Sequence, residues 1–479
     1  MKNWLLKSKM KNKVYSLVLP LVLACFNAQA QHKIQPYVDE RVELMSSIFR
    51  LIDAREYSDN NNKLYVEDIQ KAFGNYKNQD FLNSVKELRN NDGIGYDAVM
   101  AIAVRLELKN GGVKLSNENT QTLDKRWNKE KVSEFMKGLN QYYKTSKFHQ
   151  FYESHEKDYQ QAAKAFSDSV LVKFNQDWYN QFYGKQPNEE YKVFIGYGNG
   201  GGNYGPRVSK KSGKDIVYAI VSGGDFNGRQ LTYSSDYAPT LIHEFNHSFV
   251  NYILETKDYK KELEVAGKQI LEAVKKPMAE QAYTNWETII NESLVRAAVI
   301  IYMKENQFSE KAIKEEYKDQ RNRQFLWMPE LVELLEEYQK NRKQYSSLET
   351  FYPNIVAFFQ KTGGNINTIV NDFEAKKPKV KSLSPDINGK IDVDSSLKTM
   401  VVEFDKPLTG KRMSIHWGSL GKQAVPISSR PIFINDNNAI KLELKMEPNK
   451  EYEFILTGNG FESVDGYPLQ EYTVKFKTK

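Results

Sequence analysis

The sequence is poor in cysteine and in histidine. Cys25 is the only cysteine among 479 residues, which excludes an intramolecular disulfide and a metal site built from several thiolates. There are only six histidines, so two that fall at a regular helical spacing are an informative signal. The sequence also lacks a run of about 20 apolar residues, the length that a membrane-spanning helix needs, and we expect no transmembrane helix.

The N-terminus has the pattern of an export signal. Residues 1–30 contain five lysines and no acid, then the short apolar segment "VYSLVLPLVLAC" and the small-residue pattern Ala-Gln-Ala at 28–30. This order predicts a signal peptide that is cleaved before Gln31. Cys25 ends a stretch that loosely resembles a bacterial lipoprotein box, although Leu23 fits that pattern poorly, so a lipid anchor is the alternative. We expect an exported protein that is periplasmic, outer-membrane-associated or extracellular.

There is little excess charge of either sign outside the leader. The formal net charge is +7, and the five lysines of the leader account for most of it, because 7 − 5 leaves +2 for the remaining chain. No run of Lys and Arg alternates with aromatic residues, so we expect no nucleic-acid partner. With 40% hydrophobic and 13% aromatic residues, the chain has enough apolar surface for folded domains.

Different patterns follow the leader. Residues 31–189 are predicted to be mainly helical, because apolar residues recur at helical intervals, as in "DERVELMSSIFRLI". Residues 190–375 start with strand-like segments around the glycine-rich "NGGGNYGP" and continue as helices. Residues 376–382 hold the basic run "KKPKVK" and are predicted to be an extended linker. Residues 383–479 consist of short alternating strands, typical of a β-sandwich, so the expected fold class is α+β.

The segment "TLIHEFNHSFVN" carries the strongest chemical signal. It is expected to lie on a helix from about 239 to 254, with Ser235 or Asp236 as its cap and Pro239 in its first turn. His243 and His247 then stand one turn apart on one face, so both imidazoles can reach a single Zn²⁺ ion.

The residues around the two histidines suggest further roles. Glu244 is placed to accept a proton from water that zinc would acidify, so we expect it to be the general base. Asn251, one turn after His247, can orient that ring. The alternative is an inert amphipathic helix.

A catalytic zinc site needs a third protein ligand. Val250 and Ile253 occupy the positions where a longer histidine motif would have Gly and His, so we expect a carboxylate instead. The apolar segment "WETIINESLVRAAVIIYM" at 286–303 contains Glu292, the favoured ligand, and Glu287, the reserve. The competing interpretation of Glu292 is an ordinary i,i+4 ion pair with Arg296.

The remaining histidines do not suggest ligands. His149 and His155 lie six residues apart on predicted helices, which places them on different faces, and we expect structural or solvent-facing roles. His416 lies in the last module and is given no catalytic part.

"HEFNH" followed by "NESLVRA" resembles the gluzincin branch of zincin metallopeptidases. Together with "VDERVELMSSIFRLI" and "GGGNYGP", these segments are similar to an exported bacterial family known only as a domain of unknown function with predicted peptidase character, over about residues 36–375. The resemblance implies that His243, His247 and Glu292 bind zinc and that Glu244 is the base. It also implies that Asn203 and Tyr204 meet the substrate backbone at an edge strand, although a glycine turn that closes a hairpin remains the alternative.

The resemblance completes the expected architecture. It is a mainly helical zincin-like metallopeptidase domain with a small β-sheet, followed by a β-sandwich that resembles bacterial Ig-like modules, which space, stabilise or attach surface enzymes. Gluzincins supply a Tyr or His to the oxyanion, and neither spacing nor composition selects one among Tyr204, Tyr283 and Tyr302.

The expected function is an exported zinc metallopeptidase that acts on a peptide or protein. The alternatives are a zinc hydrolase of another amide or ester, and a non-catalytic surface binding protein with a degenerate metal site.

Overall fold

The computed structural model describes residues 34–109, 111–117, 123–124, 126–184 and 189–479. The predicted signal peptide over 1–30, with Cys25 and the cleavage site before Gln31, lies outside these ranges. Residues Gln35–Lys479 form one compact unit. None of the helices in the described ranges combines the length and the apolarity that a bilayer crossing requires.

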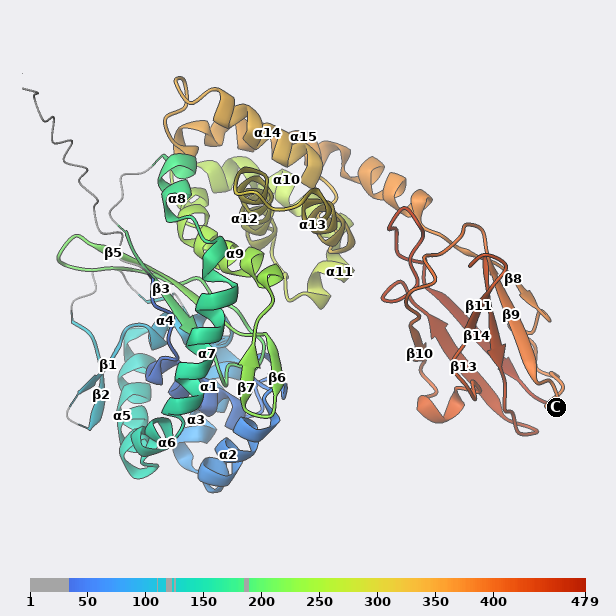
Figure 1. Cartoon of the computed structure of the whole chain (residues 1–479), viewed down its shortest axis with the longest axis horizontal. Coiled ribbons are helices and arrows are strands. Elements are labelled where there is room, and N and C mark those ends of the chain that lie inside the picture. The colour runs from blue at the N-terminus through green and yellow to red at the C-terminus, as the bar shows by residue number, and fades with distance from the viewer. Residues whose placement is uncertain (1–33, 110, 118–122, 125, 185–188) are drawn as a thin grey trace, which may run out of the picture. The chain divides into compact units, whose positions relative to one another are not determined.

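Residues 34–184 are mainly helical, as the periodicity predicts (Figure 1). In α1 the buried side chains cover every face, because neighbouring helices and strand β1 enclose it. Asp39 caps the start of the helix by accepting a hydrogen bond from the Arg41 N–H. The helices are α1 (Glu40–Leu51), α2 (Lys63–Phe73), α3 (Asp80–Asp92), α4 (Asp97–Ala103), α5 (Lys129–Thr145), α6 (Phe148–Ser154), α7 (Glu156–Ser169) and α8 (Gln176–Tyr183). One antiparallel hairpin interrupts them, made of β1 (Leu106–Lys109) and β2 (Gly112–Leu115).

A small mixed sheet follows, with the order β3-β5-β4. β3 (Glu189–Ile195) runs parallel to β5 (Asp215–Val221), and both are largely buried. β4 (Arg207–Ser209) pairs antiparallel with β5 as the edge strand, and a bridge between Tyr204 and Ile220 extends that edge toward the glycine-rich turn. A separate hairpin of β6 (Asp225–Asn227) and β7 (Gln230–Thr232) leads to the next helix.

The second helical group packs around α12. The helices are α9 (Ala238–Val250), α10 (Tyr259–Ala273), α11 (Lys275–Glu280), α12 (Trp286–Glu305), α13 (Glu310–Asn322), α14 (Met328–Lys340) and α15 (Leu348–Lys376). α12 is buried on all sides and packs against α9, α10, α13 and α14. A helix that is apolar all round is stable only in such an interior.

The α9 helix differs from its predicted limits. Pro239 lies in the first turn as expected, but the helix ends at Val250, and a short 3₁₀ turn at Ile253–Glu255 follows. Neither Ser235 nor Asp236 caps it, because both belong to a preceding 3₁₀ turn that Ser234 caps. The N-cap position of α9 is Tyr237, which makes no side-chain capping bond, so the predicted cap is wrong.

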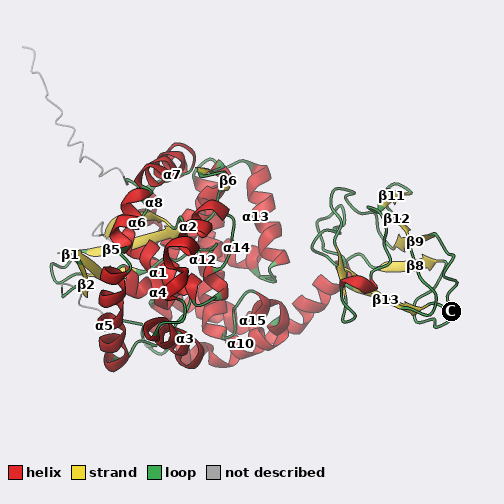
Figure 2. Cartoon of the chain, turned by 90° about the horizontal axis from the view of Figure 1, so that it is seen from below, coloured by secondary structure: helices red, strands yellow, loops and turns green. Residues whose placement is uncertain are grey.

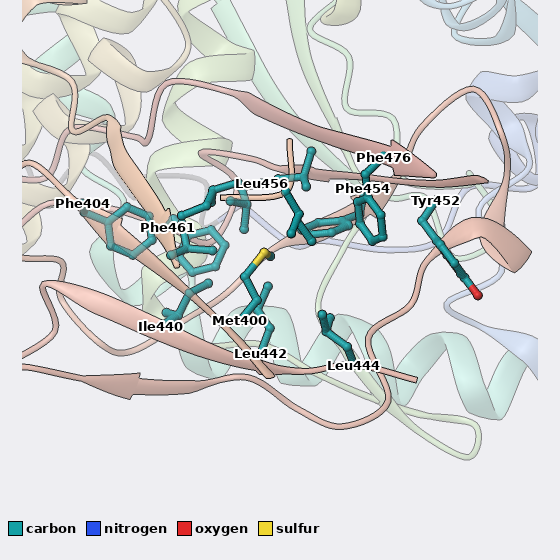
Figure 3. Packing of buried hydrophobic residues seen from close by; sticks show 14 of the residues in the cluster. Met400, Phe404, Ile440, Leu442, Leu444, Tyr452, Phe454, Leu456, Phe461 and Phe476 are labelled. Carbon is teal, nitrogen blue, oxygen red and sulfur yellow. The ribbon is translucent and has the colours of Figure 1, made fainter. Parts of the chain in front are cut away.

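Strands replace helices after α15 (Figure 2). Two antiparallel sheets have the orders β11-β12-β9-β8 and β10-β13-β14, and side chains of both contribute to one apolar core (Figure 3). The strands are β8 (Val380–Ser384), β9 (Thr399–Phe404), β10 (Ile415–Trp417), β11 (Ile432–Ile434), β12 (Ala439–Glu443), β13 (Glu451–Leu456) and β14 (Tyr472–Lys477).

The linker predicted over 376–382 is shorter in the structure. Lys376 is the last residue of α15 and Val380 is the first residue of β8, so only residues 377–379 connect the two elements. Pro378 disfavours helix at the residue before it, which explains the end of α15. The rest of the predicted linker is recruited into β8 by pairing with β9.

Candidate metal centre

Two histidines of α9 face each other. Their Nε2 atoms are 3.1 Å apart, and the side chains of His243 and His247 are only 17% and 16% exposed. The one-turn spacing puts both rings on one face of the helix. α9 itself is held in place by packing against α12 and β5 (Figure 1).

Glu292 of α12 completes a three-residue group. Its Oε1 lies 3.4 Å from His247 Nε2, and its Oε2 lies 3.6 Å from His243 Nε2. Ligands of a tetrahedral zinc ion, each about 2.0–2.1 Å from the metal, stand roughly 3.3 Å from one another. The observed separations match that value, and in the described ranges this is the only group of three or more such side chains that could share one ion.

The electrostatics favour the forms that bind a metal. Burial lowers the pKa of His243 well below its usual range, so the ring is neutral and keeps a lone pair. Burial alone would raise the pKa of Glu292, but Arg296 and the two histidines hold that pKa at about 2. The carboxylate is therefore ionised at neutral pH.

Asn251 orients His247, as the sequence predicts. Its Oδ1 lies 3.2 Å from His247 Nδ1. An amide oxygen can only accept, so Nδ1 carries the hydrogen and the lone pair of the free tautomer is on Nε2, which faces Glu292.

Glu244 is buried beside the histidines. It is only 4% exposed. Burial, and then the negative charge of Glu292, raise the pKa of Glu244 well above its usual range. A carboxyl group with a raised pKa holds a proton more readily than an ordinary surface carboxylate, which suits a group that exchanges protons.

The glycine-rich segment runs directly against this part of α9. A Cβ atom on Gly205 would collide with the backbone carbonyl oxygen of Glu244 and would lie 3.2 Å from His247 Cβ. The edge of the sheet and the histidine motif are therefore in contact, and glycine is required for that approach.

Asn203 and Tyr204 make internal contacts. Asn203 Oδ1 accepts from the Ser222 N–H at 2.7 Å and from Tyr237 Oη at 3.0 Å. Tyr204 is buried, and its N–H and C=O both pair with Ile220. These contacts give no support to the substrate role predicted for the two side chains.

The reserve ligand and the other histidines lie outside the group. Glu287 pairs with Lys260 Nζ at 3.3 Å. His155 is buried and contacts Asp68 Oδ2 at 3.0 Å, which is a structural role. His149 is exposed beside Glu40, and the exposed His416 contacts Ser414 Oγ.

Of the three tyrosines considered from the sequence, Tyr283 is the one whose hydroxyl bonds to Glu292. Its hydroxyl donates to Glu292 Oε2 at 3.1 Å, whereas Tyr302 Oη donates to the Lys173 carbonyl and Tyr204 stacks on Tyr57. Sequence reasoning could not select Tyr283, because it lies in the irregular segment before α12, where no periodicity relates it to Glu292.

Comparisons with known proteins give a family but no activity. No curated protein matches the chain. Three solved structures of the surface-layer protein SbsC match at 14% identity, with TM-scores of 0.16, 0.17 and 0.16. The matches cover 54%, 50% and 50% of this chain and 35%, 34% and 58% of theirs, so the chain spans about a third of the first structure. TM-scores this low carry no argument about fold or function.

The family model described as "Domain of unknown function (DUF4932)" matches residues 34–358. This range contains the helical region, the mixed sheet and the three clustered side chains of the candidate metal centre. The chain therefore belongs to the DUF4932 family.

Proposed function

We propose that this protein is a zinc-dependent metallopeptidase of the zincin type. The observation that carries the proposal is the convergence of His243, His247 and Glu292 at separations suited to one tetrahedral ion, next to the buried Glu244. Two neutral imidazoles and one carboxylate are the ligand set of many catalytic zinc sites, which keep a further position open.

Each residue has a distinct part in the proposed reaction. His243, His247 and Glu292 would hold the ion, and bound zinc would acidify water and polarise the scissile carbonyl. Glu244 would take a proton from the attacking water and pass it to the leaving amine. The raised pKa of Glu244 supports this role, because the same group must both accept and return the proton.

The surrounding architecture also supports the gluzincin assignment. The two histidines and the base lie on α9, the third ligand lies on the later helix α12, and an antiparallel sheet edge contacts α9. In the same proposal, residues 383–479 are an Ig-like module, because two antiparallel sheets enclose a common core. Export through the N-terminal leader, and a peptide or protein as substrate, also belong to this proposal.

The buried Glu292–Arg296 pair favours a second candidate, a binding protein without catalysis. Arg296 can neutralise Glu292 in the absence of a metal, so burial of this carboxylate does not by itself require an ion. Metal analysis of purified protein separates the candidates. About one zinc per chain supports the enzyme, and a gently prepared chain that neither contains nor takes up zinc contradicts it.

Activity is tested by digestion of a peptide library, with chelated and zinc-restored controls and an ester panel for the other hydrolase alternative. Glu244→Gln should retain zinc and lower the rate by about 10²–10⁴-fold. His416→Gln is the matched control, because this exposed side chain lies outside the proposed site. A Glu244→Gln protein that hydrolyses peptides as fast as the wild type would show that the assigned base is wrong.

A further inference from the structure

We propose that Tyr283 and Arg296 are positioning residues that fix the orientation of the Glu292 carboxylate toward the two histidines. This inference rests on the proposed function, because it concerns how the third ligand of that site is held. Under this proposal Tyr283 orients a metal ligand, and it does not donate a hydrogen bond to the oxyanion of the substrate.

Two donated hydrogen bonds and one further ion-pair contact converge on one oxygen of Glu292. Arg296 Nε and Nη2 lie 3.0 Å and 2.9 Å from Oε2, and Tyr283 Oη lies 3.1 Å from the same atom. The other oxygen, Oε1, is left facing His247 Nε2 at 3.4 Å. A carboxylate whose Oε2 is saturated in this way presents Oε1 as its free acceptor.

Arg296 is held rigidly by a neighbouring helix. Its Nη1 donates to Gln320 Oε1 of α13 at 3.1 Å, and its guanidinium lies over the Phe325 ring, 4.9 Å from the centroid. Gln320 is almost completely buried and donates in turn to Glu316 Oε1 at 2.6 Å. The orientation of Glu292 therefore depends on a chain of contacts from α13, and not on its own helix alone.

The Tyr283 hydroxyl is fully used by this arrangement. It accepts from Arg296 Nη2 at 2.8 Å and donates its single hydrogen to Glu292 Oε2. A phenol has only one hydrogen to donate, so this hydroxyl is not available to an oxyanion while the contact persists. The geometry therefore points to orientation of a ligand rather than to contact with the reacting carbonyl.

The first measurement is zinc affinity, determined in the full mature chain by competition with a chromophoric chelator. Tyr283→Phe should weaken zinc binding by about 10–100-fold, the usual effect of removing a group that orients a metal ligand. Arg296→Lys keeps the charge but loses the two-nitrogen contact, and it should weaken binding in the same direction.

Tyr302→Phe is the matched control. Tyr302 is buried in α12 like Glu292, but its hydroxyl donates to the Lys173 carbonyl at 2.7 Å, so the same atom is removed without touching the site. Its zinc affinity should stay within about threefold of the wild type, a change of at most about 0.7 kcal/mol. Thermal melting of the zinc-free variants identifies any that fail to fold. Tyr283→Phe removes only a hydroxyl group, so it is the variant that changes the packing least.

The second measurement is the visible spectrum of the Co²⁺-loaded chain, which reports ligand geometry independently of activity. The Tyr283→Phe spectrum should differ from the wild-type spectrum, and the Tyr302→Phe spectrum should not. A Tyr283→Phe chain with wild-type zinc affinity and an unchanged Co²⁺ spectrum would overturn the positioning role, even if its peptidase activity fell. A wild-type chain that binds no zinc would instead overturn the proposed function together with this inference.

Discussion

The buried ion pair between Glu292 and Arg296 gives a prediction that does not depend on catalysis. We consider a double-mutant cycle in zinc-free protein, with Glu292→Leu and Arg296→Met alone and combined. Both side chains are less than 10% exposed, with a shortest contact of 2.9 Å. Either single change leaves its partner charged and buried, which costs about 3–5 kcal/mol of unfolding free energy.

The pKa of Glu292 reports the net electrostatic stabilisation of its carboxylate, to which Arg296 and then both histidines contribute. The pKa of Glu292 falls from the usual 4.5 to about 2 against the opposing effect of burial. At about 1.4 kcal/mol per pKa unit, the net stabilisation of the ionised form is about 3 kcal/mol. Because the folded pKa is depressed, this stabilisation is present above about pH 4.5 and is lost as the pH falls toward 2.

We therefore expect a coupling of about 3 kcal/mol between the two substitutions, with the double variant much less destabilised than the sum of the singles. The assay is urea unfolding with a chelator present at neutral pH. Glu264 and Lys268 form an exposed pair with the same i,i+4 spacing, and their cycle should show no measurable coupling. Coupling below about 1 kcal/mol for the buried pair would refute the reasoning, because it would not exceed the value usual for exposed pairs.

Two further predictions concern the glycine-rich segment and a buried carboxyl group. Gly205→Ala should destabilise the fold by more than about 1 kcal/mol and weaken zinc binding, because its Cβ meets the Glu244 backbone. Gly364→Ala is the control, since its new Cβ meets nothing within 4 Å. Urea unfolding and zinc titration of the two variants are compared with those of the wild type. Burial raises the pKa of Glu43 from the usual 4.5 to about 7, so this carboxyl group lowers the stability of the fold as the pH rises through that window. In urea titrations of zinc-free protein, the wild type should therefore lose about 3 kcal/mol relative to Glu43→Gln between about pH 4.5 and 7. Equal stability of the two glycine variants, or parallel pH profiles for Glu43→Gln and wild type, would contradict these predictions.

Periodicity was sufficient to place the two histidines. A four-residue spacing on an amphipathic helix puts His243 and His247 together wherever the helix lies, so their contact is a local property. Glu292 could be proposed from the cost of burying a carboxylate in an apolar helix. Its contact with the histidines depends on how α9 and α12 pack, and the sequence pattern carries no information about that angle.

Features of the site that depend on irregular backbone could not be predicted. Tyr283 reaches Glu292 from a segment without periodicity, and Asn203 points inward because a loop conformation directs it to the Ser222 N–H. The length of the linker was overestimated for a similar reason. Residues 380–382 belong to β8 because they pair with β9, and their basic composition does not indicate that pairing. In each case the deciding partner lies beyond the local repeat of a helix or strand.

Apolar side chains cover most of the surface of α12, and the hydrophobic effect that buries them is non-directional. Leucine, isoleucine, valine and alanine side chains are buried along the helix and form no directional bonds through their side chains. Glu292 and Arg296 have partners on adjoining segments. A shift of the helix by one turn would separate both charged groups from these partners and leave them buried among apolar side chains. The same two side chains that shape the proposed ligand set thus also select one packing register for the central helix of the domain.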